Sequence, residues 1–572
     1  MSSSTELLLE FRNWRGCFQS GAENEVVAVN DLSFTLQQGE SLGLVGESGS
    51  GKSITALSAI QLLPQAAEAQ GEIIWKGEEL LSTLPAADLQ QLRARKIGMI
   101  FQEPLSSLNP LICCGHQLLE PLLAHLQLDK KAAEAAAKKW FSKVGLRDPE
   151  RIFQSYPHQL SGGQRQRVMI AMALCTEPEL LIADEPTTAL DVTVQKGILE
   201  LIQQLQQELG LAVLFISHDL GVIREITDKV LVMWKGQVVE SGEVGQVLDH
   251  PQHPYTKGLV ACRPGVAGGK HRLPTVPDFL DRQPEEVNTH LKALEEAARE
   301  RQLERLEKLT HAPLCLEAED LSVQYTKKRN WLGQVTDYHQ AVDGVSLSLR
   351  QGECLGVVGE SGSGKTTLGK ALVRLVNLQA GKIAFAGQQV EGLSEREFRP
   401  LRPKIQMVFQ DPFSSLNPKL TIEALLTEPL RIHAPHLNRE ARLQRVLEVL
   451  TQVGLDHSAL ERFPKAFSGG QRQRIGIARA LLFEPEVLIC DESVSALDVS
   501  VQAQVLNLLK RLQTTYEFSM IFISHDLGVI RFIADRVLVM QHGKVVEQGS
   551  AEQLFTAPQK EYTQALLSAV LR

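Results

Sequence analysis

Two adjacent acids, Asp184 and Glu185, follow a short apolar run and come soon after a Ser-Gly-Gly-Gln turn. The turn, Ser161 to Gln164, opens a predicted helix, where main-chain N–H groups and the helix dipole favour an anion. The run at 180–183 reads as a strand that delivers Asp184 to hold a Mg²⁺ ion through water, and Glu185 to orient an attacking water. This order of residues predicts phosphate chemistry.

The whole stretch occurs twice. Residues 156–192, YPHQLSGGQRQRVMIAMALCTEPELLIADEPTTALDV, correspond to residues 463–499, FPKAFSGGQRQRIGIARALLFEPEVLICDESVSALDV. Ser161 matches Ser468, about 307 residues later, which is far beyond the period of a short solenoid repeat. The sequence therefore predicts a duplicated domain.

A glycine-rich loop precedes each copy. GESGSGKS at 46–53 and GESGSGKT at 359–366 each follow an apolar run and precede a helix-like segment. This spacing in this context is typical of a phosphate loop, because glycine-rich main-chain amides wrap the phosphates while the lysine reaches the terminal ones. We expect Lys52 at the β- and γ-phosphates and Ser53 at Mg²⁺. Two such loops indicate nucleotide binding.

Each copy also has a glutamine at the end of one predicted strand and a histidine just past another. The glutamines are Gln102 and Gln410, and the histidines are His218 and His525. A histidine beyond the C-terminal end of a strand faces the crevice where α/β sheets bind ligands, so these two could contact a γ-phosphate. Taken singly, either type is more often an ordinary surface residue, but both repeat in register.

The bulk composition limits the class of protein. A content of 43% hydrophobic and 22% charged residues is ordinary for a globular protein, and a net charge of −9 disfavours nucleic acid as the partner. The eight cysteines form no CxxC pair and no signal segment opens the chain, which favours a reducing cytoplasm. No apolar run approaches the roughly 18 residues that cross a bilayer, so we expect any membrane function to use separate chains.

We expect two domains, 1–262 and 313–572, joined by a linker at 263–312. The linker is broken by proline and glycine, continues as a charged helix from Pro284, and is predicted to be a solvated, slightly acidic spacer. Further expected elements are an edge strand at 7–18, strands at 26–36 and 41–45, and helical inserts at 118–144 and 422–453.

With a phosphate loop, a glutamine strand, an LSGGQ turn, an Asp-Glu pair and SHD in this order twice, nearly the whole chain resembles the nucleotide-binding domains of ABC ATPases. The LSGGQ turn is the specific part, although Phe467 replaces its leucine in the second copy. The resemblance implies an α/β fold of two tandem P-loop ABC ATPase domains, each a mixed sheet core with an antiparallel β subdomain and a helical subdomain. It implies ATP and Mg²⁺ as cofactors and two hydrolytic sites.

The resemblance also implies the site residues. The catalytic residues are Glu185, Glu492, His218, His525, Gln102 and Gln410. The Mg²⁺ residues are Ser53, Gln102, Asp184, Thr366, Gln410 and Asp491. The nucleotide-binding residues are Gly46, Ser48, Gly49, Ser50, Gly51, Lys52, Ser53, Ile54, Gly359, Ser361, Gly362, Ser363, Gly364, Lys365, Thr366 and Thr367, with Phe18 and Tyr325 stacking on adenine. The turns add Ser161, Gly162, Gly163, Gln164, Ser468, Gly469, Gly470 and Gln471, each turn facing the nucleotide on the other domain's loop, while Asp191 and Asp498 match the loop through which the domains sense each other.

Four strings look like the oligopeptide and dipeptide importer branch of that family: FQEPLSSLNP, FQDPFSSLNP, YPHQLSGGQRQRV and HPQHPYTKGL. That branch includes glutathione, nickel and peptide-antibiotic uptake systems. It implies two transmembrane permease subunits that dock on the segments after Gln102 and Gln410, a periplasmic substrate-binding protein, and a peripheral position on the cytoplasmic face of the bacterial inner membrane. Several relatives carry a cysteine cluster after the HPYT motif; here only Cys262 follows, so we expect no iron–sulfur centre.

The main alternative is a soluble tandem ABC ATPase that acts on ribosomes. Such a protein needs a long, often basic helical linker to meet RNA phosphates, which the acidic linker here does not resemble. A DNA-repair ABC protein would need coiled-coil or zinc-ligand insertions. The sequence leaves the cargo open.

Overall fold

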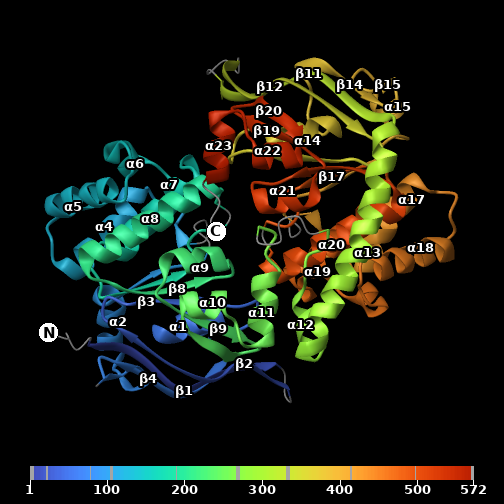
Figure 1. Cartoon of the computed structure of the whole chain (residues 1–572). Coiled ribbons are helices and arrows are strands. Elements are labelled where there is room, and N and C mark those ends of the chain that lie inside the picture. Colours follow the sequence, from blue (N-terminus) through green and yellow to red (C-terminus); the bar gives the residue numbers. More distant parts are fainter. Residues whose placement is uncertain are drawn as a thin grey trace. The chain divides into compact units, whose positions relative to one another are not determined.

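The computed structural model describes residues 6–20, 24–77, 79–102, 107–188, 190–265, 271–329, 335–411, 415–495 and 497–568. The chain divides into two compact units, Met1–Val260 and Ala261–Val570 (Figure 1). The predicted domain and linker boundaries are finer than this division and stay a prediction.

The first unit contains two sheets. An antiparallel sheet has the order β2-β1-β4-β5, with β1 Leu7–Ser20, β2 Asn24–Gln37, β4 Ala67–Trp75 and β5 Glu79–Leu80. The other sheet has the order β10-β9-β3-β8-β7-β6, with β3 Ser41–Val45, β6 Ile97–Ile100, β7 Leu180–Asp184, β8 Ala212–Ser217, β9 Lys229–Trp234 and β10 Gln237–Glu243. Its strands are parallel except for the edge strand β10, so the sheet is mixed.

The helices of the first unit fall into two groups. Four of them pack on one another as a helical subdomain: α4 Cys114–Leu126, α5 Lys130–Lys143, α6 Pro149–Gln154 and α7 Gly162–Leu174. The others accompany the sheets: α1 Lys52–Ala59, α2 Ala86–Arg95, α8 Val192–Leu209, α9 Leu220–Ile226, α10 Val244–Asp249 and α11 Pro254–Ala261.

The central strands of the mixed sheet are covered on both faces. Every residue of β3, β7 and β8 is buried, as expected for parallel strands that read as continuous apolar runs. Their side chains share one core with the antiparallel sheet, in which Phe11 and Leu36 pack with Leu44 and Ile182. Parallel pairing brings the C-terminal ends of these strands to one edge, where ligands of α/β sheets bind.

The second unit repeats this architecture. Its antiparallel sheet has the order β12-β11-β14-β15, with β11 Leu314–Arg329, β12 Val335–Arg350, β14 Ala380–Phe385 and β15 Gln388–Gln389. Its mixed sheet has the order β16-β17-β18-β13-β19-β20, with β13 Cys354–Val358, β16 Ile405–Val408, β17 Val487–Asp491, β18 Ser519–Ile523, β19 Arg536–Gln541 and β20 Lys544–Ser550. The helices are α12 Val276–Leu280, α13 Pro284–His311, α14 Lys365–Leu372, α15 Glu395–Phe398, α17 Ile422–His433, α18 Arg439–Gln452, α19 Gly469–Leu481, α20 Val499–Tyr516, α21 Leu527–Ile533, α22 Ala551–Thr556 and α23 Glu561–Ser568.

Two expectations about local structure were wrong. The strand expected at the edge, β1, pairs with β2 on one side and β4 on the other, because the half-polar segment of β4 also forms a strand. The linker is not simply a solvated spacer: α13 packs on the rest of the second unit, where Arg305 pairs with Asp535 and donates to the main-chain O of Gly352 at 2.7 Å. The helical inserts and the charged helix from Pro284 are confirmed. Within the described part of the chain, no helix has both the length and the apolar character to span a bilayer.

Candidate active site

The first glycine-rich loop connects β3 to α1. Gly46 and Gly51 have φ angles of +153° and +104°. A Cβ at Gly46 would lie 2.2 Å from the main-chain O of Met233, and one at Gly51 would lie 2.7 Å from that of Ala28, so only glycine fits. The loop therefore folds tightly around the N-terminus of α1, where the first N–H groups and the helix dipole suit a phosphate.

Lys52, the first residue of α1, lies across this loop. Its side chain is buried, and its Nζ donates to the main-chain O atoms of Gly46 and Glu47, both at 2.8 Å. The ammonium group is thus held where phosphate oxygens could take the place of two carbonyl oxygens. The other predicted loop residues, Ser48, Gly49, Ser50, Ser53 and Ile54, lie in the same loop or the first turn of α1.

Asp184 ends β7 and faces the first turn of α1. Ser53 Oγ donates to Asp184 Oδ1 at 3.3 Å, and the carboxylate is only 5% exposed. Burial, with the charge of Glu185 adding to it, raises the pKa of Asp184 to about 6 against the hydrogen bond of Ser53 and the charge of Lys52. A buried carboxylate beside a hydroxyl is a donor set of hard oxygen atoms that fits Mg²⁺, and a divalent cation would keep the carboxylate ionised.

The backbone conformation of Glu185 sets the direction of its side chain, and three neighbouring side chains contact its carboxylate. Its φ is +49°, which is uncommon outside glycine, and its main-chain N–H donates to the main-chain O of Ile216 at 2.9 Å. Its Oε2 accepts hydrogen bonds from Gln102 Nε2 and Thr188 Oγ1, both at 2.9 Å, and lies 3.1 Å from His218 Nδ1. The carboxylate therefore has a fixed position.

The charge state of Glu185 follows from these contacts. Burial opposes ionisation, but the hydrogen bond and charge of His218, followed by the hydrogen bond of Thr188, outweigh it and lower the pKa of Glu185 to about 2. Burial also opposes the charge on His218, whose pKa is nevertheless raised by Glu185. Glu185 and His218 therefore form a half-buried ion pair next to Asp184.

The second unit has the same arrangement. Gly359 and Gly364 have φ angles of +152° and +102°, and Lys365 Nζ donates to the main-chain O atoms of Gly359 and Glu360 at 2.8 Å. The remaining contacts are Thr366 Oγ1 to Asp491 Oδ1 at 3.0 Å, Gln410 Nε2 to Glu492 Oε2 at 2.8 Å, and His525 Nδ1 to Glu492 Oε2 at 3.3 Å. Burial raises the pKa of Asp491, whereas His525 lowers that of Glu492 against the effect of burial.

One hydroxyl beside the two glutamates has different partners in the two units. Thr188 donates to the carboxylate of Glu185, whereas Ser495, its counterpart, donates to the main-chain O of Glu492 at 2.9 Å. The carboxylate of Glu492 is therefore held by Gln410 and His525 without this third hydrogen bond.

The Ser-Gly-Gly-Gln turns form helix caps. Ser161 Oγ accepts from the N–H of Gln164 at 3.3 Å, while the Gln164 side chain accepts from the N–H of Ser161 at 3.1 Å. A Cβ at Gly163 would lie 2.5 Å from Val194, so this glycine lets α7 pack closely on the first turn of α8. The turn Ser468 to Gln471 forms the same cap on α19, and Gly470 meets Val501 in the same way.

The two predicted adenine-stacking residues lie at equivalent places in the antiparallel sheets. Phe18 pairs with Val26, two positions from Ala28, whose carbonyl lies against Gly51. Tyr325 pairs with His339, two positions from Ala341, which has the same relation to Gly364. Tyr325 is 41% exposed, which leaves its ring open to a ligand.

Two tyrosines that the sequence motifs did not indicate also reach the loops. The hydroxyl of Tyr255, a buried residue of α11, accepts a hydrogen bond from the N–H of Glu47 at 2.9 Å. The hydroxyl of Tyr562 in α23 accepts from the N–H of Glu360 at 3.2 Å. The available signal was the Tyr-Thr pair that occurs in both tail segments, HPQHPYTKGL and APQKEYTQALL.

Comparisons with known proteins agree with this arrangement. Residues 29–188 and 342–495 match the family described as ABC transporter, and residues 239–288 and 546–572 match the oligopeptide/dipeptide transporter, C-terminal region. The chain is 45% identical over 569 residues to the peptidoglycan transport ATP-binding protein YejF of Agrobacterium fabrum, covering 99% of this chain and 97% of that one. It is 45% identical over 558 residues to a glutathione import ATP-binding protein GsiA of Escherichia coli, covering 96% and 87%.

Proposed function

Because this chain belongs to the ABC transporter family of ATP-binding proteins, we propose that it is the ATP-hydrolysing subunit that drives uptake of short peptides through two membrane permease subunits. A substrate-binding protein delivers the cargo, and the chain works on the cytoplasmic face of the inner membrane. The relatives named above carry peptidoglycan transport and glutathione import in their names, which supports a peptide or peptide-like cargo. Neither of them is named as a ribosomal ATPase.

The observation that carries the proposal is the set of contacts that fixes the side chain of Glu185. Gln102, Thr188 and His218 fix its ionised carboxylate beside Asp184, where it can orient a water molecule and accept its proton. Lys52 and the loop amides bind the phosphates of ATP, and Ser53 and Asp184 would hold Mg²⁺. The bound ion would neutralise charge that develops on the transferred phosphoryl group. Glu492 has the same role in the second unit.

Each ATP is completed by residues of both units. The first site uses the loop of Lys52 and the turn of Ser468; the second uses the loop of Lys365 and the turn of Ser161. Family membership supports this pairing, as does the presence in each unit of a complete loop, acid pair and turn. ATP binding then closes the units on each other, and hydrolysis releases them.

The permease contacts the chain beside Gln102. A mainly apolar cavity of about 340 Å³ follows β6, lined in part by Ile60, Leu62, Met99, Phe101, Leu108 and Met169. Leu62 is 44% exposed and Phe101 40%, so the first unit presents apolar side chains that suit a short helix of a permease. Residues 103–106 of the FQEPLSSLNP string lie outside the described residues. A helix docked here would transmit movement of Gln102 to the permease.

The test is the double substitution Glu185→Gln and Glu492→Gln. It removes both bases but keeps the hydrogen-bonding shape, so ATP turnover should fall about 10²- to 10⁴-fold while ATP binding is retained. Turnover would be measured on the chain alone and with its co-purified permeases. Full activity in the double variant would refute the assignment of these bases.

The cargo is tested separately. A strain that lacks this gene should lose growth on defined short peptides as the sole source of an essential amino acid, and should regain it with the wild-type chain but not with the double variant. Normal growth of the deletion strain on every peptide tried would reject peptide uptake without touching the ATPase assignment.

A further inference from the structure

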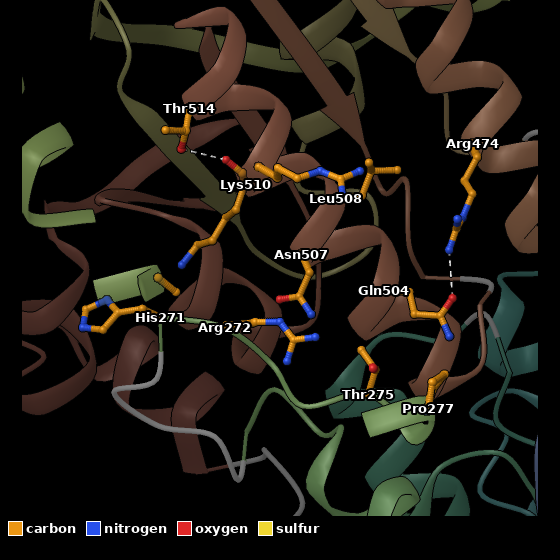
Figure 2. Close-up of a pocket in the computed structure, with 12 residues that line it drawn as sticks. His271, Arg272, Thr275, Pro277, Arg474, Gln504, Asn507, Leu508, Lys510 and Thr514 are labelled. Carbon is orange, nitrogen blue, oxygen red and sulfur yellow. Dashed lines mark hydrogen bonds between the residues drawn. The ribbon is translucent and has the colours of Figure 1, made fainter. Parts of the chain in front are cut away.

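A cavity of about 390 Å³ lies in the second unit between the linker and helices α19 and α20 (Figure 2). Its size is at the lower end of the range of small-molecule sites, about 300–1,000 Å³. Among the described residues that line it, the charged ones are all basic: Arg272, Arg474, Lys510 and Arg511, with His271 beside them. Thr275, Gln504, Asn507 and Thr514 add neutral hydrogen-bonding groups.

In the described structure, Arg474, Lys510 and Arg511 form no direct ion pair with a carboxylate. Arg474 donates to the main-chain O of Val453 at 3.2 Å and to the side chain of Gln504 at 2.8 Å, both neutral acceptors. Burial lowers the pKa of Arg474, and the charge of Arg511 lowers it further, so the two guanidinium groups repel each other. An anion between them would relieve that repulsion.

Lys510 adds to the excess. Its Nζ lies 3.9 Å from the centre of the Phe532 ring, and burial lowers its pKa to about 8 although the charges of Asp535 and Glu295 act to raise it. Only Arg272 has a direct carboxylate partner among the cavity's cations in the described structure: its guanidinium bonds both oxygens of Asp278, at 3.0 and 3.3 Å.

Hydrogen bonds fix the linker in place, where it forms one wall of the cavity. The N–H of Leu273 donates to Asn507 Oδ1 at 3.0 Å, and Asn507 Nδ2 donates to the main-chain O of Leu273 at 2.8 Å. Glu295 of α13 accepts from the main-chain N–H groups of His271 and Arg272 at 2.7 and 3.2 Å. Figure 2 shows Arg272 of the linker next to Asn507 of α20.

The duplication supplies an internal comparison. Counted from Ser161 and Ser468, the positions of Lys510 and Arg511 are taken in the first unit by Gln203 and Gln204, on α8. An ATPase unit of this chain therefore does without these two cations. Lys510 and Arg511 occur where the linker packs on α20, which points to a ligand that contacts both the linker and this helix.

We propose that this cavity binds a small oxyanion with two or more negative charges, carried by phosphate or carboxylate groups, between the linker and α20. The guanidinium groups of Arg474 and Arg511 and the ammonium group of Lys510 match such a ligand, because charge-assisted hydrogen bonds to Arg and Lys are among the strongest that proteins form. The bound anion contacts His271 and Arg272 of the linker together with Lys510 and Arg511, so it fastens the linker to the second unit.

The experiment is calorimetric titration of the full chain with inorganic pyrophosphate and, separately, with citrate, both without Mg²⁺. The chain carries Lys52→Ala and Lys365→Ala, so that the two phosphate loops lose their lysines. We expect one anion bound per chain and slower amide exchange over residues 271–280 when it is bound. Lys510→Met and Arg511→Gln should each weaken binding about tenfold or more. A preference for pyrophosphate or for citrate identifies the group that the site recognises.

Lys308→Met is the matched control, because this exposed lysine pairs with Glu517 and does not line the cavity. It should leave the affinity unchanged. Arg511 is exposed, so Arg511→Gln tests the site without disturbing the core. The proposal is overturned if neither anion saturates the chain at millimolar concentration, if both cavity variants bind as the parent does, or if Lys308→Met weakens binding equally.

Discussion

At the scale of single residues, the acids at the end of β7 are tuned in opposite directions. The pKa of Asp184 is raised to about 6 chiefly by burial, whereas that of Glu185 is lowered to about 2 because the hydrogen bond and charge of His218 outweigh burial. Asp184 has little positive charge around it, which suits a ligand of a metal cation. Glu185 is paired with His218, which keeps it ionised and in a fixed position, as a general base requires.

This contrast predicts opposite effects on stability. The folded-state pKa of Asp184, about 6, lies above the ordinary 3.8, so stability falls as pH rises through this window, and above it the cost is about 3 kcal/mol. Glu185, at about 2 instead of 4.5, contributes stability that is present above pH 4.5 and lost as pH falls towards 2. At pH 7.5, without metal or nucleotide, Asp184→Asn should raise the melting temperature of the first unit and Glu185→Gln should lower it.

Differential scanning calorimetry of the two variants and the parent provides the measurement. The chain contains two units, so the transition assigned to the first unit is the one to follow. Repeating the scans at pH 4 should shrink the gain from Asp184→Asn, since the carboxyl is then largely protonated in the folded state. A loss of stability from Asp184→Asn at pH 7.5 would contradict this prediction.

The hydroxyl that differs between the units gives a second residue-scale prediction. Thr188 bonds the carboxylate of Glu185, and a hydrogen bond to a charged group is worth about 1.5–3 kcal/mol. Thr188→Ala should therefore lower kcat about tenfold at the first site with little change in the KM for ATP. Ser495→Ala, which removes only a bond to a main-chain oxygen, should have a smaller effect.

Steady-state ATPase assays on the two alanine variants decide between these outcomes. Thr188→Ser keeps the hydroxyl and should restore activity, which separates positioning of Glu185 from packing of the methyl group. Equal losses in Thr188→Ala and Ser495→Ala would show that the asymmetry has no kinetic consequence.

The sequence sufficed for the residues with a fixed chemistry. Lys52, Asp184 and Gln102 lie where the sequence predicts them relative to a glycine loop or a strand end, and their catalytic roles stay predictions. The contact of Thr188 with Glu185 was not predictable, because it depends on the positive φ of Glu185, which no residue type signals.

At the scale of elements, the C-terminal helices α11 and α23 support the phosphate loops. Glu240 accepts hydrogen bonds from the N–H groups of Gln252 and His253 just before α11, at 2.8 and 3.0 Å, which fixes the start of that helix. Glu547 bonds the N–H groups just before α23 in the same way. Each helix then places a tyrosine hydroxyl on its loop. The regions that match the oligopeptide/dipeptide transporters therefore contact the phosphate loops.

Removing these hydroxyls should weaken ATP binding. Tyr255→Phe and Tyr562→Phe each leave a loop N–H without its acceptor, at a cost of about 1 kcal/mol, so we expect the KM for ATP to rise about fivefold while kcat stays within about twofold. Tyr338→Phe, at an exposed position of β12, is the control and should behave like the parent. A lower melting temperature with an unchanged KM would mean that the tyrosines only brace the fold.

Strands and helices differed in how far the sequence predicted them. The strand β3 has the expected bounds, because a continuous apolar run directly before a glycine-rich loop predicts a buried strand. The sequence did not predict the inner position of β1 or the docking of the linker. Both depend on partners distant in the chain: β4 for the strand, and Asn507 of α20 for the linker.

At the scale of the whole molecule, the duplication fixes what each half can do. Both units carry a loop lysine, an acid pair with its histidine and a capped Ser-Gly-Gly-Gln turn, and neither has lost a group. The fold class and the tandem order could be predicted from motif order alone. The order of the motifs does not tell which Ser-Gly-Gly-Gln turn completes the site of which phosphate loop. Combined substitutions in one turn and one loop can answer this.

Two double variants contain the same kinds of change in different combinations. Lys52→Ala with Ser468→Arg disables two parts of one proposed site, so the site of Lys365 and Ser161 should still retain one ATP per chain. Lys52→Ala with Ser161→Arg disables one part of each site, and no ATP should be retained. Because each turn serine caps its helix in the same way, both arginine substitutions should disturb folding equally. Retained nucleotide would be counted after rapid gel filtration; retention in the second variant and loss in the first would mean that each unit completes its own site.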